Sequence, residues 1–152
     1  MVWHHGLLQK LVNLNVKGRM FRFLDNFIKD RFISVLYNGV ISDSKRVSAG
    51  LPQGSILSPV LFSIYINDIF EGVEDDIDGS LYADDCAFWI GDNSFDLAYR
   101  KVQRVLDCIA EWSNWWGLMV SGNKSSCVVF SKRRTPNINW IRTQISLIHN
   151  FD

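Results

Sequence analysis

The sequence predicts an α+β fold in which helices alternate with β-hairpins. The chain has 152 residues, of which 47% are hydrophobic and 13% aromatic. That content is enough to build one core and argues against disorder. Segments with helical apolar spacing alternate with short apolar runs that turn residues join in pairs. Since no internal repeat or low-complexity linker divides the chain, we expect one globular unit.

Two helices are predicted before the first strand. Residues 6–14 form a short one. Residues 19–30 form a better one, because four apolar side chains fall on a single face. These are Met20, Leu24, Phe27 and Ile28. Both helices are expected to be packing elements.

A β-hairpin is predicted next. The apolar runs 32–37 and 40–47 flank Asn38 and Gly39. Both residue types tolerate positive φ, which a two-residue hairpin turn requires.

A glycine-flanked loop then leads into a third helix. Residues 50–54 read G-L-P-Q-G, and Ser58 and Pro59 follow. Serine can cap a helix and proline suits its first position. The apolar face would continue through Val60, Leu61, Ile64 and Tyr65.

A second hairpin carries adjacent acids at its turn. The polar, acidic connection 71–79 precedes the apolar hairpin around Asp84 and Asp85. Two adjacent carboxylates suit a divalent metal, because Mg²⁺ prefers hard oxygen ligands. The alternative is a solvated turn, since Asp is a common turn residue.

A long helix is predicted over residues 94–116 and would end at Gly117. Its apolar stripe comprises Ala98, Val102, Val105, Ile109, Trp112 and Trp116. The Trp112, Trp115 and Trp116 cluster could stack bases. Two of the three fit the stripe, which favours core packing for those two.

The last quarter of the chain is less patterned. Residues 127–130 predict a short strand, and residues 138–152 show little pattern. The basic run Lys132, Arg133 and Arg134 either contacts nucleic-acid phosphate or forms a solvated edge.

The net charge and the cysteine content limit the class of protein to which this chain can belong. The formal charge is zero, with 16 basic and 16 acidic residues, so any contact with a polyanion must be local. The three cysteines, Cys86, Cys108 and Cys127, show no C-x-x-C spacing. Cys108 and Cys127 lie in apolar runs. We expect reduced, buried thiols and an intracellular protein of the nucleus and/or cytoplasm, without a signal peptide or membrane span.

Three motifs resemble the palm of reverse transcriptases, most closely those of non-long-terminal-repeat (LINE-type) retrotransposons. Residues 50–59 match the family signature G-x-P-Q-G-S-x-L-S-P in full, and residues 82–85 read Y-A-D-D. The third match includes Gly117, Lys124 and Ser131. The resemblance implies a partial polymerase palm, a ferredoxin/RRM-like antiparallel sheet with packing helices. It makes residues 1–152 a single incomplete reverse transcriptase domain, with a core match over residues 4–131 and without fingers and thumb.

The resemblance also implies roles for the motif residues. Asp84 and Asp85 would be catalytic and would bind Mg²⁺ in a two-metal site. Lys124 would also be catalytic, near the triphosphate, where it could protonate the leaving group, and the remaining matched residues would contact substrate or template. These are Pro52, Gln53, Gly54, Tyr82 and Ala83. The expected partners are an RNA template, a DNA primer and a deoxynucleoside triphosphate.

Structural roles remain as alternatives for several of these residues. Gly54 would then be an ordinary turn glycine, Lys124 a solvated cation, and Tyr82 and Ala83 packing residues of the hairpin.

The resemblance predicts that the isolated chain is inactive. The first palm motif of the family begins with an Asp that is another essential metal ligand, and this sequence matches only the end of that motif, at His4, Leu7 and Leu8. The chain is therefore expected to be a truncated fragment. The alternatives are a non-catalytic remnant that binds nucleic acid or protein, and a chain without function that folds poorly alone.

Overall fold

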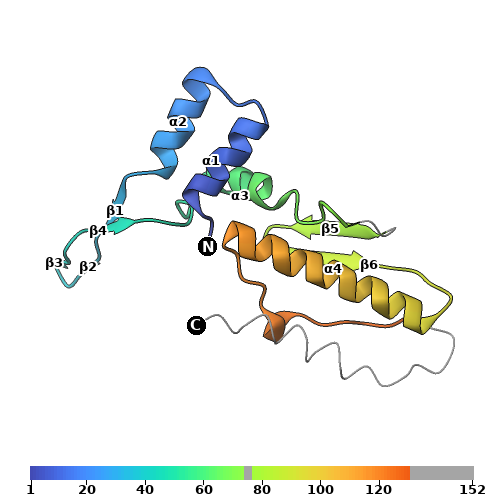
Figure 1. Ribbon diagram of the computed structural model, residues 1–152. Helices are drawn as coiled ribbons and strands as arrows, with labels where there is room; N and C mark the ends of the chain where they lie inside the picture. The colour runs from blue at the N-terminus through green and yellow to red at the C-terminus, as the bar shows by residue number, and fades with distance from the viewer. Residues whose placement is uncertain (74–76, 131–152) are drawn as a thin grey trace. The chain divides into compact units, whose positions relative to one another are not determined.

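The computed structural model describes residues 1–73 and 77–130, in which helices combine with short antiparallel strand pairs (Figure 1). The predicted α+β class is confirmed. The chain divides into two compact units, Met1–Glu71 with Ile77–Trp89, and Gly72–Asp76 with Ile90–Asp152.

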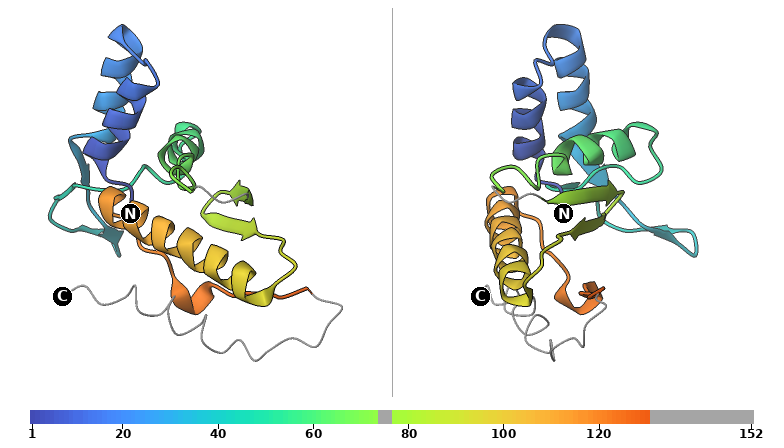
Figure 2. Two further views of the ribbon diagram at one scale, coloured as in Figure 1. Left: turned by 45° about the vertical axis from the view of Figure 1, so that its right-hand side comes forward. Right: turned by 90° about the vertical axis from the view of Figure 1, so that its right-hand side faces the viewer.

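The first unit begins with an antiparallel helix pair, α1 (His4–Asn13) and α2 (Gly18–Ile28), as Figure 2 shows. The predicted helices at residues 6–14 and 19–30 are both confirmed. Leu24 and Ile28 of α2 are buried as expected. Met20 is 59% exposed, however, because the first turn of α2 lies at the end of the pair, beside the loop that joins the two helices.

The core of this unit forms where α1 contacts both α2 and α3 (Leu57–Ile66). Its buried apolar side chains come from all three helices and their flanks. They are Val2, Leu7, Leu8, Leu11, Leu24, Ile28, Leu61, Tyr65, Ile66 and Ile69.

A buried cation joins two of these helices. Lys10 of α1 is 5% exposed, and its ammonium donates to the backbone carbonyl of Tyr65 at 2.6 Å and to the carboxylate of Asp68. Burial lowers the pKa of Lys10. The pairing compensates part of the cost of burying this charge.

The first predicted hairpin is present as two short ladders. Strand β1 (Arg31–Ile33) pairs with β4 (Lys45–Val47), and β2 (Leu36–Tyr37) pairs with β3 (Val40–Ile41). The turn between β2 and β3 has φ values of 48° at Asn38 and 77° at Gly39, as predicted for this dipeptide.

A serine interrupts this hairpin between its two ladders. The hydroxyl of Ser42 accepts the backbone N–H of Val35 at 2.9 Å. A side chain thus takes the place of a backbone carbonyl, and the regular ladder breaks there.

The second hairpin consists of β5 (Asp78–Tyr82) and β6 (Asp85–Trp89). Its base packs on Phe70, whose ring lies edge-on to that of Phe88 at 6.4 Å between centroids. A Cβ atom at Gly79 would lie 2.6 Å from Cε2 of Phe70. Glycine at this position therefore permits close packing of the hairpin on the residues that follow α3.

The second unit contains the long helix α4 (Phe95–Trp116), which ends at Gly117 with φ 64°. This confirms the predicted helix and its C-cap. Val105, Ile109 and Trp112 are buried, whereas Trp115 is 81% exposed. The prediction that two of the three tryptophans belong to the apolar stripe is consistent with Trp116 being half-buried.

The segment after α4 differs from the prediction. A short 3-10 helix, η1 (Gly122–Lys124), follows, but residues 127–130 do not form a strand within the described part of the chain. The β propensity of this segment does not suffice, because a strand also needs a neighbour that shares its backbone hydrogen bonds. The predicted features at residues 132–134 and 138–152 lie outside the described residues.

The expectation of buried thiols was wrong. Cys86 and Cys127 are exposed, Cys108 is half-buried, and all three are free. An apolar run in the sequence does not bury a cysteine when, as at residues 127–130, most of the run itself stays exposed. In residues 1–73 and 77–130, no helix is both long and apolar enough to cross a membrane.

Candidate functional site

The two adjacent carboxylates lie where β5 turns into β6. Tyr82 and Asp85 are opposite each other in the ladder, so Ala83 and Asp84 form a two-residue turn. Ala83 has φ 50°, a left-handed conformation that costs a residue with a Cβ about 1–2 kcal/mol. All four side chains are exposed, with Tyr82 at 82%. The turn thus presents both carboxylates to solvent.

The carboxylate pair has the chemistry of a divalent-metal site and lacks a complete ligand set. Asp84 and Asp85 supply hard oxygen atoms, which Mg²⁺ and similar ions prefer. Among the residues that the structure describes, no group of three or more His, Cys, Asp or Glu side chains lies together in a way that could hold a metal. The pair therefore fits part of such a site.

The loop before α3 is shaped by two glycines. Gly50 and Gly54 have φ values of 82° and 79°, which glycine adopts without strain. A Cβ atom at Gly54 would meet nothing within 4 Å. Gln53 and Gly54 are exposed and Pro52 is half-buried. The turn conformation alone explains Gly54, and the open space beside it also admits a ligand.

Ser58 has a different role from the predicted one. Helix α3 begins at Leu57 with Ile56 at its N-cap position, and no side chain caps it there. The Ser58 hydroxyl donates to the Pro52 carbonyl at 2.6 Å. Ser55 Oγ accepts the backbone N–H of Leu57 at 3.2 Å. Because the helix starts at Leu57, two residues before the predicted start at Pro59, Ser58 falls within its first turn, and its hydroxyl holds the loop.

The start of the loop is held by residues that sequence reasoning missed. The carbonyl oxygen of Gly50 accepts a hydrogen bond from the Arg31 guanidinium and lies 2.8 Å from Nε2 of the buried His4. The N–H of Gly50 donates to the Val2 carbonyl at 2.7 Å. His4 and Arg31, which are 46 and 19 positions away in the sequence, thus hold the Gly50 carbonyl in place. No local sequence pattern indicates such distant contacts.

Lys124 lies in the second unit, at the end of η1, and its side chain is exposed. Its backbone N–H donates to the Ser121 carbonyl at 3.1 Å. Its predicted role beside the triphosphate stays a prediction. The structure brings together the four residues of the hairpin turn, and separately the three loop residues Pro52, Gln53 and Gly54.

Known sequences match most of the chain. The family profile described as reverse transcriptase (RNA-dependent DNA polymerase) matches residues 1–145. Two relatives are named RNA-directed DNA polymerase from mobile element jockey. The one from Drosophila melanogaster is 32% identical over 87% of this chain, and the one from Drosophila funebris is 31% identical over 99%.

A further relative is the probable RNA-directed DNA polymerase from transposon X-element of Drosophila melanogaster, 32% identical over 89% of this chain. The matches cover 15%, 17% and 15% of these three relatives, so the chain spans a small part of their length. No solved structure matches it. With a family match over nearly its whole length, the chain belongs to the reverse transcriptase (RNA-dependent DNA polymerase) family.

Proposed function

We propose that this chain is a palm segment of a retrotransposon reverse transcriptase and contributes to RNA-directed DNA synthesis. The observation that carries the proposal is the Asp84–Asp85 pair on an exposed two-residue turn, in a chain of this family. The partners would be an RNA template, a DNA primer and a deoxynucleoside triphosphate.

Asp84 and Asp85 would hold two Mg²⁺ ions. When bound, such ions activate the primer 3′-hydroxyl and neutralise the pyrophosphate leaving group. The carboxylates suit this role because their exposed oxygen atoms are the hard ligands that Mg²⁺ prefers. Tyr82, opposite Asp85 in the ladder, would help to position the primer end.

The loop before α3 would contact the template beside the new base pair. The exposed Gln53 amide can donate and accept hydrogen bonds, and the open space at Gly54 lets a nucleotide approach the backbone. His4, Arg31 and Ser58 would keep this loop in place through their contacts with Gly50 and Pro52. Lys124 would neutralise or protonate the leaving group.

We also propose that the 152-residue chain does not extend a primer by itself. Two carboxylates on one turn supply only a few of the oxygen ligands that two metal ions need, so most of the ligands must come from other groups. The described residues place no third acid, histidine or cysteine with them.

A chimera tests the proposal. The matched segment of the Drosophila melanogaster jockey polymerase would be replaced by residues 1–131, and magnesium-dependent extension of a primer on an RNA template would be measured. We expect extension that Asp84→Asn lowers by at least about 100-fold and that Asp43→Asn, a matched change at another exposed acid, leaves intact.

Equal extension by the Asp84→Asn chimera would contradict the proposed role of this carboxylate. Extension by the isolated 152-residue chain, lost in Asp84→Asn, would contradict the proposal that the chain is inactive alone. A non-catalytic nucleic-acid-binding role would instead give RNA binding without extension in either setting.

A further inference from the structure

Charge is strongly segregated along this electrically neutral chain. None of its 16 Lys and Arg residues lies between Arg46 and Arg100, whereas ten of its 16 Asp and Glu residues do. This stretch contains both the Gly50–Pro59 loop and the Asp84–Asp85 turn. Its own side chains therefore offer no cation to a nucleic-acid strand, and cationic contacts with phosphate must come from elsewhere in the chain.

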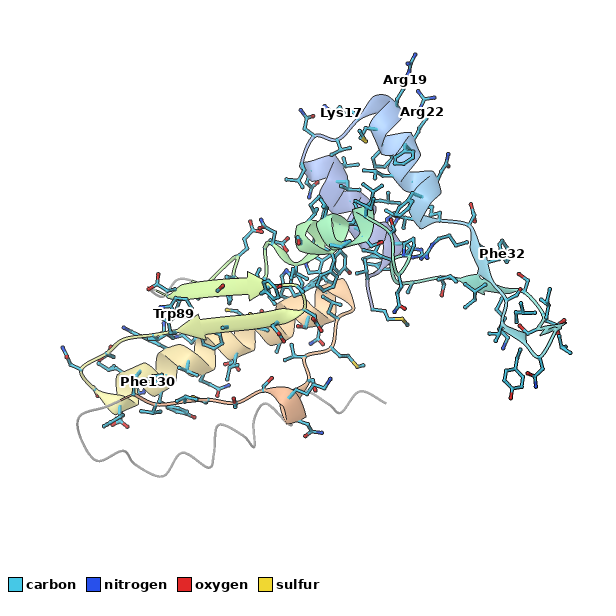
Figure 3. All side chains as sticks on the ribbon, turned by 180° about the vertical axis from the view of Figure 1, so that it is seen from behind. Lys17, Arg19, Arg22, Phe32, Trp89 and Phe130 are labelled. Atoms are coloured by element: carbon cyan, nitrogen blue, oxygen red, sulfur yellow. The ribbon has the colours of Figure 1, made fainter. Side chains whose placement is uncertain are left out.

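A cluster of cations lies at the end of the α1–α2 pair where the loop joins the two helices. Lys17 immediately precedes α2, and Arg19 and Arg22 occupy its first two turns. Figure 3 shows the three labelled side chains at the same end of the helix pair, extending outward. All three are exposed, and the first 24 residues contain no Asp or Glu.

These cations also differ from Lys10, Lys29 and Arg46 of the same unit, because no described carboxylate pairs with them. Lys10, Lys29 and Arg46 each form an ion pair with an aspartate. Lys17, Arg19 and Arg22 form none within the described part of the chain. Three positive charges therefore remain available to an external anion.

Their position is unfavourable for the isolated helix. Arg19 and Arg22 are three residues apart on α2, and like charges at this spacing repel each other. They also lie near the positive end of the helix dipole, where anions stabilise and cations destabilise. α2 has no acidic residue in its first turn and no side-chain cap. A bound anion would relieve both effects.

The surroundings of the cluster favour a single-stranded nucleic acid as this anion. Arginine guanidinium groups match phosphate oxygens with paired hydrogen bonds. Phe23, next to Arg22, is largely exposed, and its ring stacks on that of Phe27 at 6.4 Å between centroids. Exposed aromatic faces beside cations are typical of proteins that bind bases and backbone together.

We propose that Lys17, Arg19 and Arg22 form a docking surface for single-stranded RNA, with Phe23 offering its ring to a base. This surface is separate from the Asp84–Asp85 turn and needs no metal. The choice of RNA as the polyanion rests on the proposed function, but binding at this surface does not require the carboxylates.

Fluorescence anisotropy of a labelled single-stranded RNA of about 20 nucleotides, with the 152-residue chain between about 50 and 200 mM salt, tests the proposal. The combined Lys17→Gln, Arg19→Gln and Arg22→Gln variant should bind on the order of 100-fold more weakly at about 0.1 M salt. Its plot of log affinity against log salt should be shallower by about 2, as expected for three lost phosphate contacts on a single strand.

The matched control is the combined Lys45→Gln, Arg46→Gln and Arg100→Gln variant. It removes the same number of lysines and arginines from other exposed positions, and it should retain most of the affinity. An equal loss in both variants would overturn the proposal, because binding would then follow net charge alone. Unchanged binding by the cluster variant would also overturn it.

Two further measurements keep the proposal separate from folding and from the metal site. In NMR titrations of the unaltered chain, RNA should shift the amide signals of residues 17–23, and shifts confined to other residues would contradict the assignment. Asp84→Asn with Asp85→Asn should leave RNA affinity the same or higher. Loss of binding in that variant would instead place the RNA at the carboxylate turn.

Vesicles that contain phosphatidylserine distinguish RNA from a membrane surface. The chain should bind these vesicles more weakly than RNA at the same salt concentration. Tighter binding to vesicles than to RNA, again lost in the cluster variant, would overturn RNA as the ligand.

Discussion

The Nε2 atom of His4 lies 2.8 Å from the carbonyl oxygen of Gly50, although the two residues are 46 positions apart in the sequence. Because a carbonyl only accepts, this contact is a hydrogen bond in the tautomer that carries a hydrogen on Nε2. The contact links the start of α1 to the start of the Gly50–Pro59 loop. The Arg31 guanidinium donates to the same oxygen, so one peptide group is held from two directions.

Removal of either donor should loosen the loop. We expect His4→Ala and Arg31→Ala each to lower the free energy of unfolding by about 1–3 kcal/mol, and to lower the NMR order parameters of Gln53 and Gly54. His5→Ala is the control, because that neighbouring imidazole is exposed. Equal order parameters in the unaltered chain and His4→Ala would refute this anchoring role.

Lys10 should be essential for the stability of the first unit. Lys10→Met removes the ammonium that Tyr65 and Asp68 share and leaves a carboxylate that is only 29% exposed. We expect a loss of about 3 kcal/mol in urea unfolding. Lys29→Met breaks the pair with Asp25, in which the lysine side chain is 43% exposed against 6% for Lys10, and should cost less than about 1 kcal/mol. Similar losses in the two variants would argue against a special role for the buried pair.

Ala83 should be a strained position. Ala83→Gly removes the cost of φ 50° but gives the unfolded chain more freedom, so we expect a net stabilisation of about 0.5–1 kcal/mol. Ala87→Gly, in the middle of β6, should destabilise by a similar amount. Thermal unfolding of both variants measures the contrast. Destabilisation by Ala83→Gly would show that the turn is not strained.

Asp92 should make the stability of the second unit depend on acid pH. Its carboxylate accepts the Ser94 N–H at 2.9 Å and pairs with Lys101 at 2.9 Å. The Ser94 hydrogen bond, with Lys101 as the next cause, holds the pKa of Asp92 below its ordinary value of 3.8. Since the folded-state pKa is the lower one, this stabilisation is present above pH 3.8 and is lost as pH falls through the folded-state pKa.

Thermal unfolding against pH checks this behaviour. The unaltered chain should exceed Asp92→Asn in melting temperature at neutral pH, and the difference should vanish in the acid range. Lys101→Gln keeps the Ser94 hydrogen bond and should lose only part of the difference. If the melting temperatures of the unaltered chain and Asp92→Asn still differ at a pH below the folded-state pKa of Asp92, the assignment would be contradicted.

Local sequence patterns predicted the helices and the turns well. The spacing of apolar residues indicated α2 and α4, and Gly117 and the Asn38–Gly39 pair indicated where the chain turns, because these signals depend on neighbours in sequence. Residues 127–130 show the limit. Their β propensity predicts a strand, yet strand formation depends on a partner that local sequence does not reveal.

The candidate site was also predictable only in part. The motif residues Asp84, Asp85, Gln53 and Gly54 were identified from the sequence, and the structure places them on an exposed turn and loop. The contacts of His4 with Gly50 and of Ser58 with Pro52 were not predictable. They depend on tertiary packing and on a two-residue difference in where α3 begins.

The central claim is that Asp84 and Asp85 bind divalent metal, and paramagnetic relaxation by Mn²⁺ tests it most directly. Mn²⁺ shares the preference of Mg²⁺ for oxygen ligands, and even weak binding broadens nearby NMR signals. Asp75→Asn with Asp76→Asn, the other adjacent aspartate pair in the sequence, serves as the control. We predict broadening of the amide signals of residues 83–86 that persists in the control and disappears in Asp84→Asn with Asp85→Asn. Unbroadened signals at these residues, or the same broadening after both carboxylates are replaced, would contradict the account.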